Sequence, residues 1–376
     1  MEGGKRYSVG KISVLEVSGD YREMGRQYGR LFKDRIAKFY ETAIEGYFIR
    51  RSNMPRLKLL AISRLIFRRY GPKIKEIFSG ISETSGVSLN NIIMLDQINT
   101  FEFMRNQDLG RCSDMAVWGS HTESGALIFG RNFDQPEYFK KFNDFLTLTI
   151  FSPDDGIPTA SIGYAGQIGV SSAINARGVF IANNEAPTEK SDVIDVNTPS
   201  VLVLELEFLM RSSSLDELDR LIKGAKANCP IIVSAGDRKT SLTYEWTASE
   251  IKVRSEDKIG ILVTTNHFVD PSWARPAILP DAYVKTLERR ANLLSMGEKY
   301  KGKFNIRKMK DVLDTTMDKG GATHLNQTTF QMVLSPDNLR MHLKVPDFQD
   351  WTEFDIKTPL TRYSLTGDAE FSIQQV

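Results

Sequence analysis

CSDMAVWGSHTESGALIFGRNFD, residues 112–134, is where the hydrophobic pattern of the chain changes from helical spacing to alternation. Residues 112–120 and 126–134 each read as a strand, and the polar segment His121–Gly125 between them is typical of a turn. The pattern therefore predicts a β-hairpin. In such a hairpin residues 131–134 lie opposite residues 112–115, so Cys112, Arg131 and Asp134 meet at one end of a sheet.

The 111 residues before this hairpin are predicted to be mostly helical. Residues 20–49 carry apolar side chains at helical spacing, and Asp20 with Glu23 three residues later has the spacing of a capping box. Further helical runs follow at 57–70, 73–86 and 92–104. The second of these helical segments contains three arginines, Arg64, Arg68 and Arg69. They indicate either an anionic partner or a solvated helix face, and the balanced overall charge favours the solvated face.

After the hairpin, strand patterns and helical patterns follow one another in blocks. Strands are predicted at 145–151, 159–165, 170–175, 179–184, 231–236, 241–247, 250–254, 259–265, 328–335 and 340–345. Helices are predicted at 200–210, 215–228, 281–300 and 306–317. This order is not a βαβ repeat, and it predicts an α+β fold in which antiparallel sheets and helices form separate layers.

Composition excludes several classes of function. The 376 residues include 49 Lys and Arg against 47 Asp and Glu, and this balance gives no electrostatic footprint for nucleic acid. Two cysteines and four scattered histidines argue against a disulfide scaffold and against a metal site. The chain has no G-x-G-x-x-G, Walker A or G-x-S-x-G motif, so we expect no cofactor, no phosphate-binding loop and no serine nucleophile elbow.

The sequence also gives an expectation about location. The first residues, MEGGKRYSVGKISVLEV, lack the apolar core and the cleavage site of a secretory signal. The longest uncharged stretch, residues 156–176, contains Pro158 and several glycines, which is typical of strands and turns and not of a membrane span. A cytoplasmic protein without a membrane span is therefore expected, while its oligomeric state is not indicated.

Four groups of residues are candidates for chemistry, and each has a structural alternative. Cys112 is either a nucleophile at a strand start or a packing cysteine, whereas Cys229 is assigned to the core. Arg131 and Asp134 form either part of a site or a surface ion pair. Amides at strand ends either donate to a developing oxyanion or serve in turns, and they are Asn183, Asn184 and Asn266.

Taken together these residues resemble a known family. Cys112 with its hairpin, GRNFD at 130–134, NNEAP at 183–187 and TTNHF at 264–268 resemble the penicillin acyltransferase (isopenicillin N acyltransferase-like) family of cysteine N-terminal nucleophile hydrolases. GDYREMGRQYG at 19–29 and VSLNNIIMLDQIN at 87–99 agree with that resemblance, which covers nearly the whole chain. The hairpin is also similar to those of choloylglycine hydrolases and penicillin V acylases.

The resemblance implies a four-layer αββα sandwich and an inactive precursor. The bond between Arg111 and Cys112 would be cut by the protein itself, which leaves a pro-segment, residues 1–111, partnered with a catalytic domain, residues 112–376. Cys112 would then act as nucleophile, and its new α-amine would act as base, because an amine with a pKa of about 8 accepts a proton at neutral pH whereas an amide nitrogen does not.

The resemblance also implies roles for the remaining candidates. Asp134 would hold the amine of Cys112, Arg131 would favour the thiolate, and Asn266 would donate to the oxyanion. Asn183 or Asn184 would assist, through the side chain or the backbone N–H, and His324 or Asn326 stands where acyltransferases carry a late arginine. Arg111 stands where those enzymes usually have glycine.

The expected function is hydrolysis of linear, non-peptide C–N amide bonds in a small-molecule acyl amide, through a thioester on Cys112, with acyl transfer to an amine as a variant. A bile-salt hydrolase or penicillin V acylase is an alternative, although the 111 residues before the cysteine argue against it. A non-catalytic binding protein that retains the scaffold is the second alternative.

Overall fold

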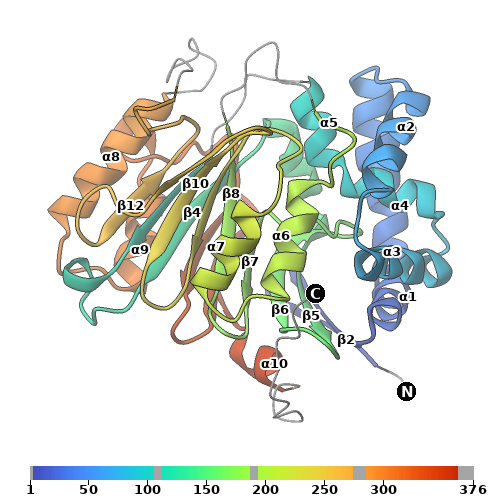
Figure 1. The fold of residues 1–376 in the computed structure, drawn as a ribbon, viewed down its shortest axis with the longest axis horizontal. Coiled ribbons are helices and arrows are strands. Elements are labelled where there is room, and N and C mark those ends of the chain that lie inside the picture. The colour runs from blue at the N-terminus through green and yellow to red at the C-terminus, as the bar shows by residue number, and fades with distance from the viewer. Residues whose placement is uncertain (1–2, 106–111, 187–193, 274–284, 363–376) are drawn as a thin grey trace.

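Two β-sheets form the centre of the molecule (Figure 1). The computed structural model describes residues 3–105, 112–186, 194–273 and 285–362. The large sheet has the strand order β1 (Lys5–Val9), β2 (Ile12–Gly19), β5 (Leu146–Pro153), β6 (Thr159–Tyr164), β7 (Ser172–Asn175), β8 (Phe180–Glu185), β9 (Ile231–Gly236), β10 (Ser241–Trp246), β11 (Ile251–Arg254). The small sheet has the order β12 (Ile261–Thr264), β3 (Ser113–Val117), β4 (Ile128–Asp134), β13 (Thr328–Ser335), β14 (Arg340–Val345), β15 (Gln349–Asp355).

The hairpin predicted from residues 112–134 is present as β3 and β4. Asp114 pairs with Arg131 and Ser113 pairs with Asn132, in antiparallel register. Every residue of both strands is buried, because the large sheet covers one face of the hairpin and helices cover the other. The hairpin therefore lies in the core of the sandwich, and its open end carries Cys112 beside Asp134.

Helices cover the outer faces of the two sheets. α6 (Val201–Leu209) packs on β7 and β8, and α7 (Leu215–Lys223) packs on α6. On the other side α8 (Thr286–Lys299) packs on β12 and β3, and α9 (Ile306–Asp314) packs on β4 and β13. The described residues thus form the four layers, helix, sheet, sheet and helix, that were expected, and α10 (Lys357–Thr361) follows the last strand.

The segment before Cys112 contains most of the remaining helices. They are α1 (Tyr21–Phe39), the π-helix η1 (Tyr40–Arg51), α2 (Arg56–Phe67), α3 (Pro72–Ser85), α4 (Leu89–Asp96) and α5 (Ile98–Arg105). The predicted N-cap is confirmed, since Asp20 Oδ1 accepts from the Glu23 N–H at 2.8 Å. α1 and α3 approach closely at three glycines, Gly25, Gly29 and Gly80. A Cβ on Gly25 would lie 2.2 Å from the Ile77 carbonyl oxygen.

This segment also contains two strands that the sequence pattern did not predict. β1 and β2 form a hairpin whose turn includes Gly10, with a φ of +61°. β2 then pairs in parallel with β5, from Ser13 opposite Thr147 to Gly19 opposite Pro153, whereas the other strand pairs are antiparallel. The residues before Cys112 are therefore built into the large sheet, and the expectation of a mostly helical segment is incomplete.

The four strands predicted at 231–265 are present, and they are divided between the two sheets. β9, β10 and β11 form an antiparallel meander at the edge of the large sheet. β12 leaves it and pairs with β3 in the small sheet, with Thr264 opposite Asp114. This crossing brings the residues after β12, including Asn266, to the end of the sandwich where Cys112 lies.

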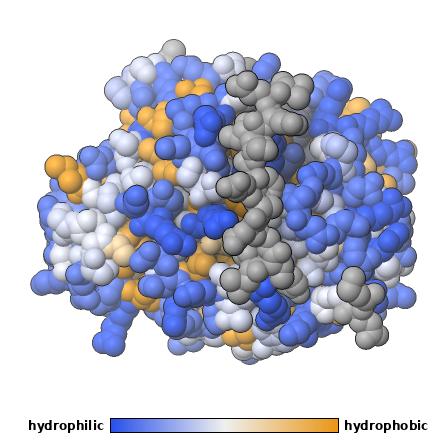
Figure 2. All heavy atoms as spheres, turned by 60° about the horizontal axis from the view of Figure 1, so that its bottom comes forward, coloured by the Kyte–Doolittle hydropathy of each residue, from blue (hydrophilic) through white to orange (hydrophobic). Residues whose placement is uncertain are grey.

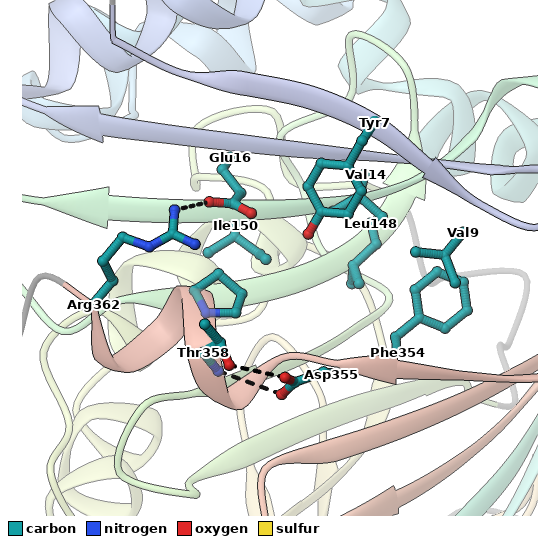
Figure 3. Close-up of a pocket in the computed structure, with 11 residues that line it drawn as sticks. Tyr7, Val9, Val14, Glu16, Leu148, Ile150, Phe354, Asp355, Thr358 and Arg362 are labelled. Atoms are coloured by element: carbon teal, nitrogen blue, oxygen red, sulfur yellow. Dashed lines mark hydrogen bonds and ion pairs between the residues drawn. The ribbon is translucent and has the colours of Figure 1, made fainter.

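The structure has a cavity of about 260 Å³ between the first strands of the large sheet and β15 with α10 (Figure 3). Its walls combine apolar side chains from β2 and β5 with the ion pair between Glu16 and Arg362, at 2.7 Å. None of the candidate site residues lines this cavity.

Figure 2 shows one face of the molecule, on which hydrophilic residues predominate and hydrophobic ones gather in small separate groups.

No helix in the described parts of the chain combines the length and the apolar composition that crossing a bilayer requires.

Candidate active site

Cys112 immediately precedes β3, and its thiol points to the end of β4. The Cys112 Sγ donates to the main-chain oxygen of Asp134 at 3.6 Å, and both residues are 4 % exposed. The register of one hairpin therefore brings the two together, as the sequence predicted. The sulfur thus lies in the interior of the protein.

Burial dominates the electrostatics of this thiol. It raises the pKa of Cys112 to about 11, with the positive charge of Arg131 opposing the rise and the carboxylate of Asp134 adding to it. Arg131 thus acts in the direction expected of it but does not outweigh desolvation. At neutral pH this thiol is protonated, so attack by the sulfur would require a group that removes its proton.

Arg131 spans the gap between the two sheets. Its side chain is fully buried, and Nη1 donates to the Ser172 hydroxyl at 2.7 Å and to the Ser171 main-chain oxygen. Nη2 donates to the main-chain oxygen of Asn183 at 2.7 Å and to Asn184 Oδ1 at 3.3 Å. Four acceptors from β7, β8 and the turn before β7 therefore fix the guanidinium, and the surface ion pair alternative does not hold for it.

Asp114 belongs to the same buried cluster, and the sequence reasoning missed it. Its carboxylate accepts from Asn184 Nδ2 at 2.5 Å and from the Ser234 hydroxyl at 2.8 Å. Burial raises the pKa of Asp114 to about 6, while Arg131 and the hydrogen-bond donors oppose the rise. A carboxylate directly before the apolar residues 115–117 was the signal in the sequence, because a charge buried in a strand needs partners.

The side chains of Asn183 and Asn184 are used within this cluster. Both N–H donors of the Asn183 amide are occupied, one by Val170 O at 2.9 Å and one by Glu205 Oε2 at 2.8 Å. Asn184 bridges Arg131 and Asp114. The structure therefore places both residues beside Arg131, as supports for the guanidinium and for Asp114.

Glu205 on α6 is a second buried carboxyl that the sequence analysis did not identify. Its side chain is fully buried, and Oε1 has no hydrogen-bond partner among the described residues. Burial raises its pKa to about 8, against the opposing effects of the Asn183 hydrogen bond and of Arg131. Glu205 is therefore protonated at neutral pH and reaches Arg131 through Asn183.

Asn266 is linked to Cys112 by an arginine from α8. The buried Arg289 donates through Nη2 to Asn266 Oδ1 at 2.9 Å and through Nη1 to the Cys112 main-chain oxygen at 2.7 Å. Asn266 Nδ2 donates to Glu185 O at 2.7 Å. Sequence reasoning missed Arg289, although its position on the same helix face as the buried Thr286 and Leu293 was a usable signal.

Thr286 supports the segment that carries Asn266. Its hydroxyl accepts from the Asn266 N–H at 3.0 Å and lies 2.9 Å from His267 Nδ1. Burial and the neighbouring cations Arg290 and Arg254 lower the pKa of His267 to about 4, so its ring is neutral at physiological pH. His267 therefore supports the structure of this segment and adds no positive charge to the site.

The remaining candidates are less directly placed. The main-chain oxygen of His324 accepts from Thr328 N–H at 2.9 Å, and Thr328 pairs with Asp134, so the His324 turn lies at the same sheet end. Arg111, the predicted cleavage position, lies outside the described residues. Cys229 packs against the large core but is only half-buried. Within the described residues no cluster of three His, Cys, Asp or Glu side chains is arranged to hold a metal ion.

Comparisons with known proteins give distant relatives. No protein-family model matches the chain. An uncharacterized protein of Archaeoglobus fulgidus is 21 % identical over 349 residues, which cover 80 % of this chain and 57 % of that protein. The chain thus spans little more than half the length of that relative.

Solved structures that are similar to this chain match about two thirds of it. The Caenorhabditis elegans ortholog of N-acylethanolamine-hydrolyzing acid amidase is 16 % identical, with 65 % of this chain and 99 % of that chain covered at a TM-score of 0.47. Penicillin V acylase from Agrobacterium tumefaciens is 11 % identical, and the match covers 66 % of this chain and 88 % of that chain at a TM-score of 0.46. A conjugated bile acid hydrolase from Clostridium perfringens is 15 % identical, and the match covers 66 % of this chain and 93 % of that chain at a TM-score of 0.42.

Proposed function

We propose that this protein is a cysteine amidohydrolase of the N-terminal nucleophile type, made as a precursor and activated by cleavage between Arg111 and Cys112. The observation that carries the proposal is the contact between the Cys112 thiol and Asp134 at the open end of one buried hairpin. A cysteine that only filled the core would not need the surrounding polar cluster of Arg131, Arg289 and Asn266, which is costly to bury.

Activation is an acyl shift followed by hydrolysis. The Cys112 sulfur attacks the Arg111 carbonyl, its proton passes to the Cys112 nitrogen, and the C–N bond breaks to leave a thioester and a free amine. Water then cleaves the thioester, which releases the Arg111 carboxylate and regenerates the thiol. Arg289 supports this step because it holds the Cys112 main-chain oxygen and so limits rotation of the residue that attacks.

The mature enzyme uses the new α-amine as its base. The amine takes the thiol proton, the sulfur attacks the amide carbonyl of the substrate, and the amine returns the proton to the leaving nitrogen. Asp134 holds the amine, and Arg131 favours the thiolate. Water completes hydrolysis of the acyl thioester, while an amine that reaches it would complete acyl transfer.

Asn266 is the proposed oxyanion donor. One of its two Nδ2 protons goes to Glu185 O, which leaves the second for the substrate oxygen. Arg289 donates to Oδ1 and so fixes which end of the amide carries the donors. The side-chain donors of Asn183 are occupied, so this residue contributes to the site through its main-chain oxygen, which accepts a hydrogen bond from Arg131.

The substrates proposed are small molecules with a linear, non-peptide acyl amide bond. N-acyl amino acids, acyl homoserine lactones, N-acylethanolamines and penicillins cover the classes to be assayed with the purified protein. During turnover the mass of the 112–376 fragment should rise by that of the acyl group in the wild type and in Cys229→Ala, whereas the uncut Cys112→Ala chain should gain no mass. Amide cleavage by Cys112→Ala at the wild-type rate would refute the proposal.

A further inference from the structure

Helix α2 has two apolar sides, and only one of them is covered. Leu59, Ser63 and Ile66 are buried on the side that faces α4 and the core. On the other side Leu57 is 79 % exposed and Leu65 is 37 % exposed. These two leucines are eight positions apart, so they lie toward the same side of α2, and we call the pair the apolar ridge. Helix α2 itself lies at the edge of the molecule (Figure 1).

The segment that carries the ridge is unusually rich in positive charge. Residues 46–75 contain nine Lys and Arg and no Asp or Glu, in a chain whose net charge is only +2. The exposed members of this set are Arg50, Arg51, Arg56, Lys58, Arg64, Arg68, Arg69 and Lys73. Ion pairs are formed by Arg56 with Glu45 and by Lys73 with Asp155, whereas Arg64 and Arg69 bond to neutral amides.

We propose that the outer face of α2 docks on the surface of membranes that contain anionic phospholipids. Leu57 and Leu65 would enter the boundary between headgroups and acyl chains, while the flanking cations contact phosphate groups. Exposed leucines bordered by arginine and lysine are the combination that interfacial helices use. The helix has 12 residues, too few to cross a bilayer, so it would lie in the plane of the surface.

Two other partners fit this face less well. Nucleic acid would use the cations but gains little from leucines, and the face offers no aromatic side chain for bases to stack on. A second copy of the chain, docked through the same face about a two-fold axis, would bring two strongly cationic surfaces together. Anionic lipid is the partner that satisfies both the charge and the apolar ridge.

Sedimentation with vesicles tests the proposal on the full-length protein. Vesicles of phosphatidylcholine with about one third phosphatidylglycerol should bind it, vesicles of phosphatidylcholine alone should bind much less, and salt should weaken the binding. Arg64→Gln with Arg68→Gln should weaken binding about 25-fold, since each cation contributes about fivefold. Leu57→Ser with Leu65→Ser should weaken it about tenfold or more at unchanged charge.

The matched controls lie on other surfaces. Ile259→Ser removes an apolar side chain that is 78 % exposed, and Lys301→Gln with Lys303→Gln removes two exposed cations, so both should bind like the wild type. Unchanged thermal unfolding shows that the α2 variants remain folded. The proposal is overturned if anionic vesicles do not bind, if the leucine variant binds like the wild type, or if the controls lose binding equally.

Discussion

Arg289 donates a hydrogen bond of 2.7 Å to the main-chain oxygen of Cys112, a residue 177 positions earlier in the chain. The same guanidinium donates to Asn266 Oδ1 at 2.9 Å. One buried arginine thus joins the strand that carries the thiol to the segment that carries the proposed oxyanion donor. The fork geometry of arginine makes this possible, because two parallel groups of donors reach two acceptors at once.

Replacement of Arg289 should therefore reduce catalysis more than it reduces binding of substrate. We expect Arg289→Gln to lower kcat/KM and the rate of self-cleavage by about 100-fold, the usual scale when a reacting group is misplaced. Arg289→Lys should recover only part of this, since lysine cannot hold both acceptors. Arg290→Gln is the matched control, because Arg290 is the next residue on the helix and pairs with Asp257 instead. Wild-type kinetics in Arg289→Gln would remove this residue from the site.

Asp134 is expected to be needed for the chemistry itself. Asp134→Asn keeps the shape of the side chain but not its charge, so the α-amine of Cys112 loses its partner and the rate should fall at least about 100-fold. Kinetics on already processed protein separate this effect from a defect in cleavage. Asp144→Asn, an exposed change two residues before β5, should leave the rate unaltered. Equal rates in the two variants would contradict the assignment.

The buried carboxyl of Glu205 should make stability depend on pH. Its pKa is about 8 in the folded chain and near 4.5 when unfolded, so between these values the folded protein binds a proton that the unfolded chain releases. The free energy of unfolding should thus fall as pH rises from about 4.5 to 8. Glu205→Gln should flatten that slope in denaturant titrations at pH 5, 7 and 8.5. A slope identical to that of the wild type would contradict the raised pKa.

The two processed fragments should remain together. β2 lies between β1 and β5 in the large sheet, and its residues from Ile12 to Val17 are buried. Loss of the first 111 residues would expose the edge of β5 and the apolar surface beneath α1, which is unfavourable. On gel filtration of cleaved protein both fragments should elute as one species and separate only in denaturant. Separate elution in native buffer would refute this.

Some of the site is accessible from the sequence because it depends on local register. The turn at residues 121–125 alone places Cys112 beside Asp134. Asp20 caps its helix by accepting a hydrogen bond from Glu23, only three residues later. The parallel pairing of β2 with β5, by contrast, joins residues more than 130 positions apart, and no local pattern specifies it. Predicting a helix or strand does not indicate which distant partner it finds.

The missed residues have a common physical cause. Arg289 and Glu205 are charged side chains within helical patterns, where a charge usually marks the solvated face. Here they are buried because each finds specific partners across layers, Arg289 at Cys112 and Glu205 at Asn183. Such pairs depend on how helices and sheets stack, which a single sequence does not reveal.

The central claim is that Cys112 severs its own link to Arg111 and thereby gains the amine that activates it. Intact-mass measurement of the freshly purified, denatured protein tests this most directly. We expect two masses, those of residues 1–111 and 112–376, for the wild type and for Cys229→Ala, and one uncut mass for Cys112→Ala. A single uncut wild-type chain that hydrolyses amides at full rate would contradict the claim.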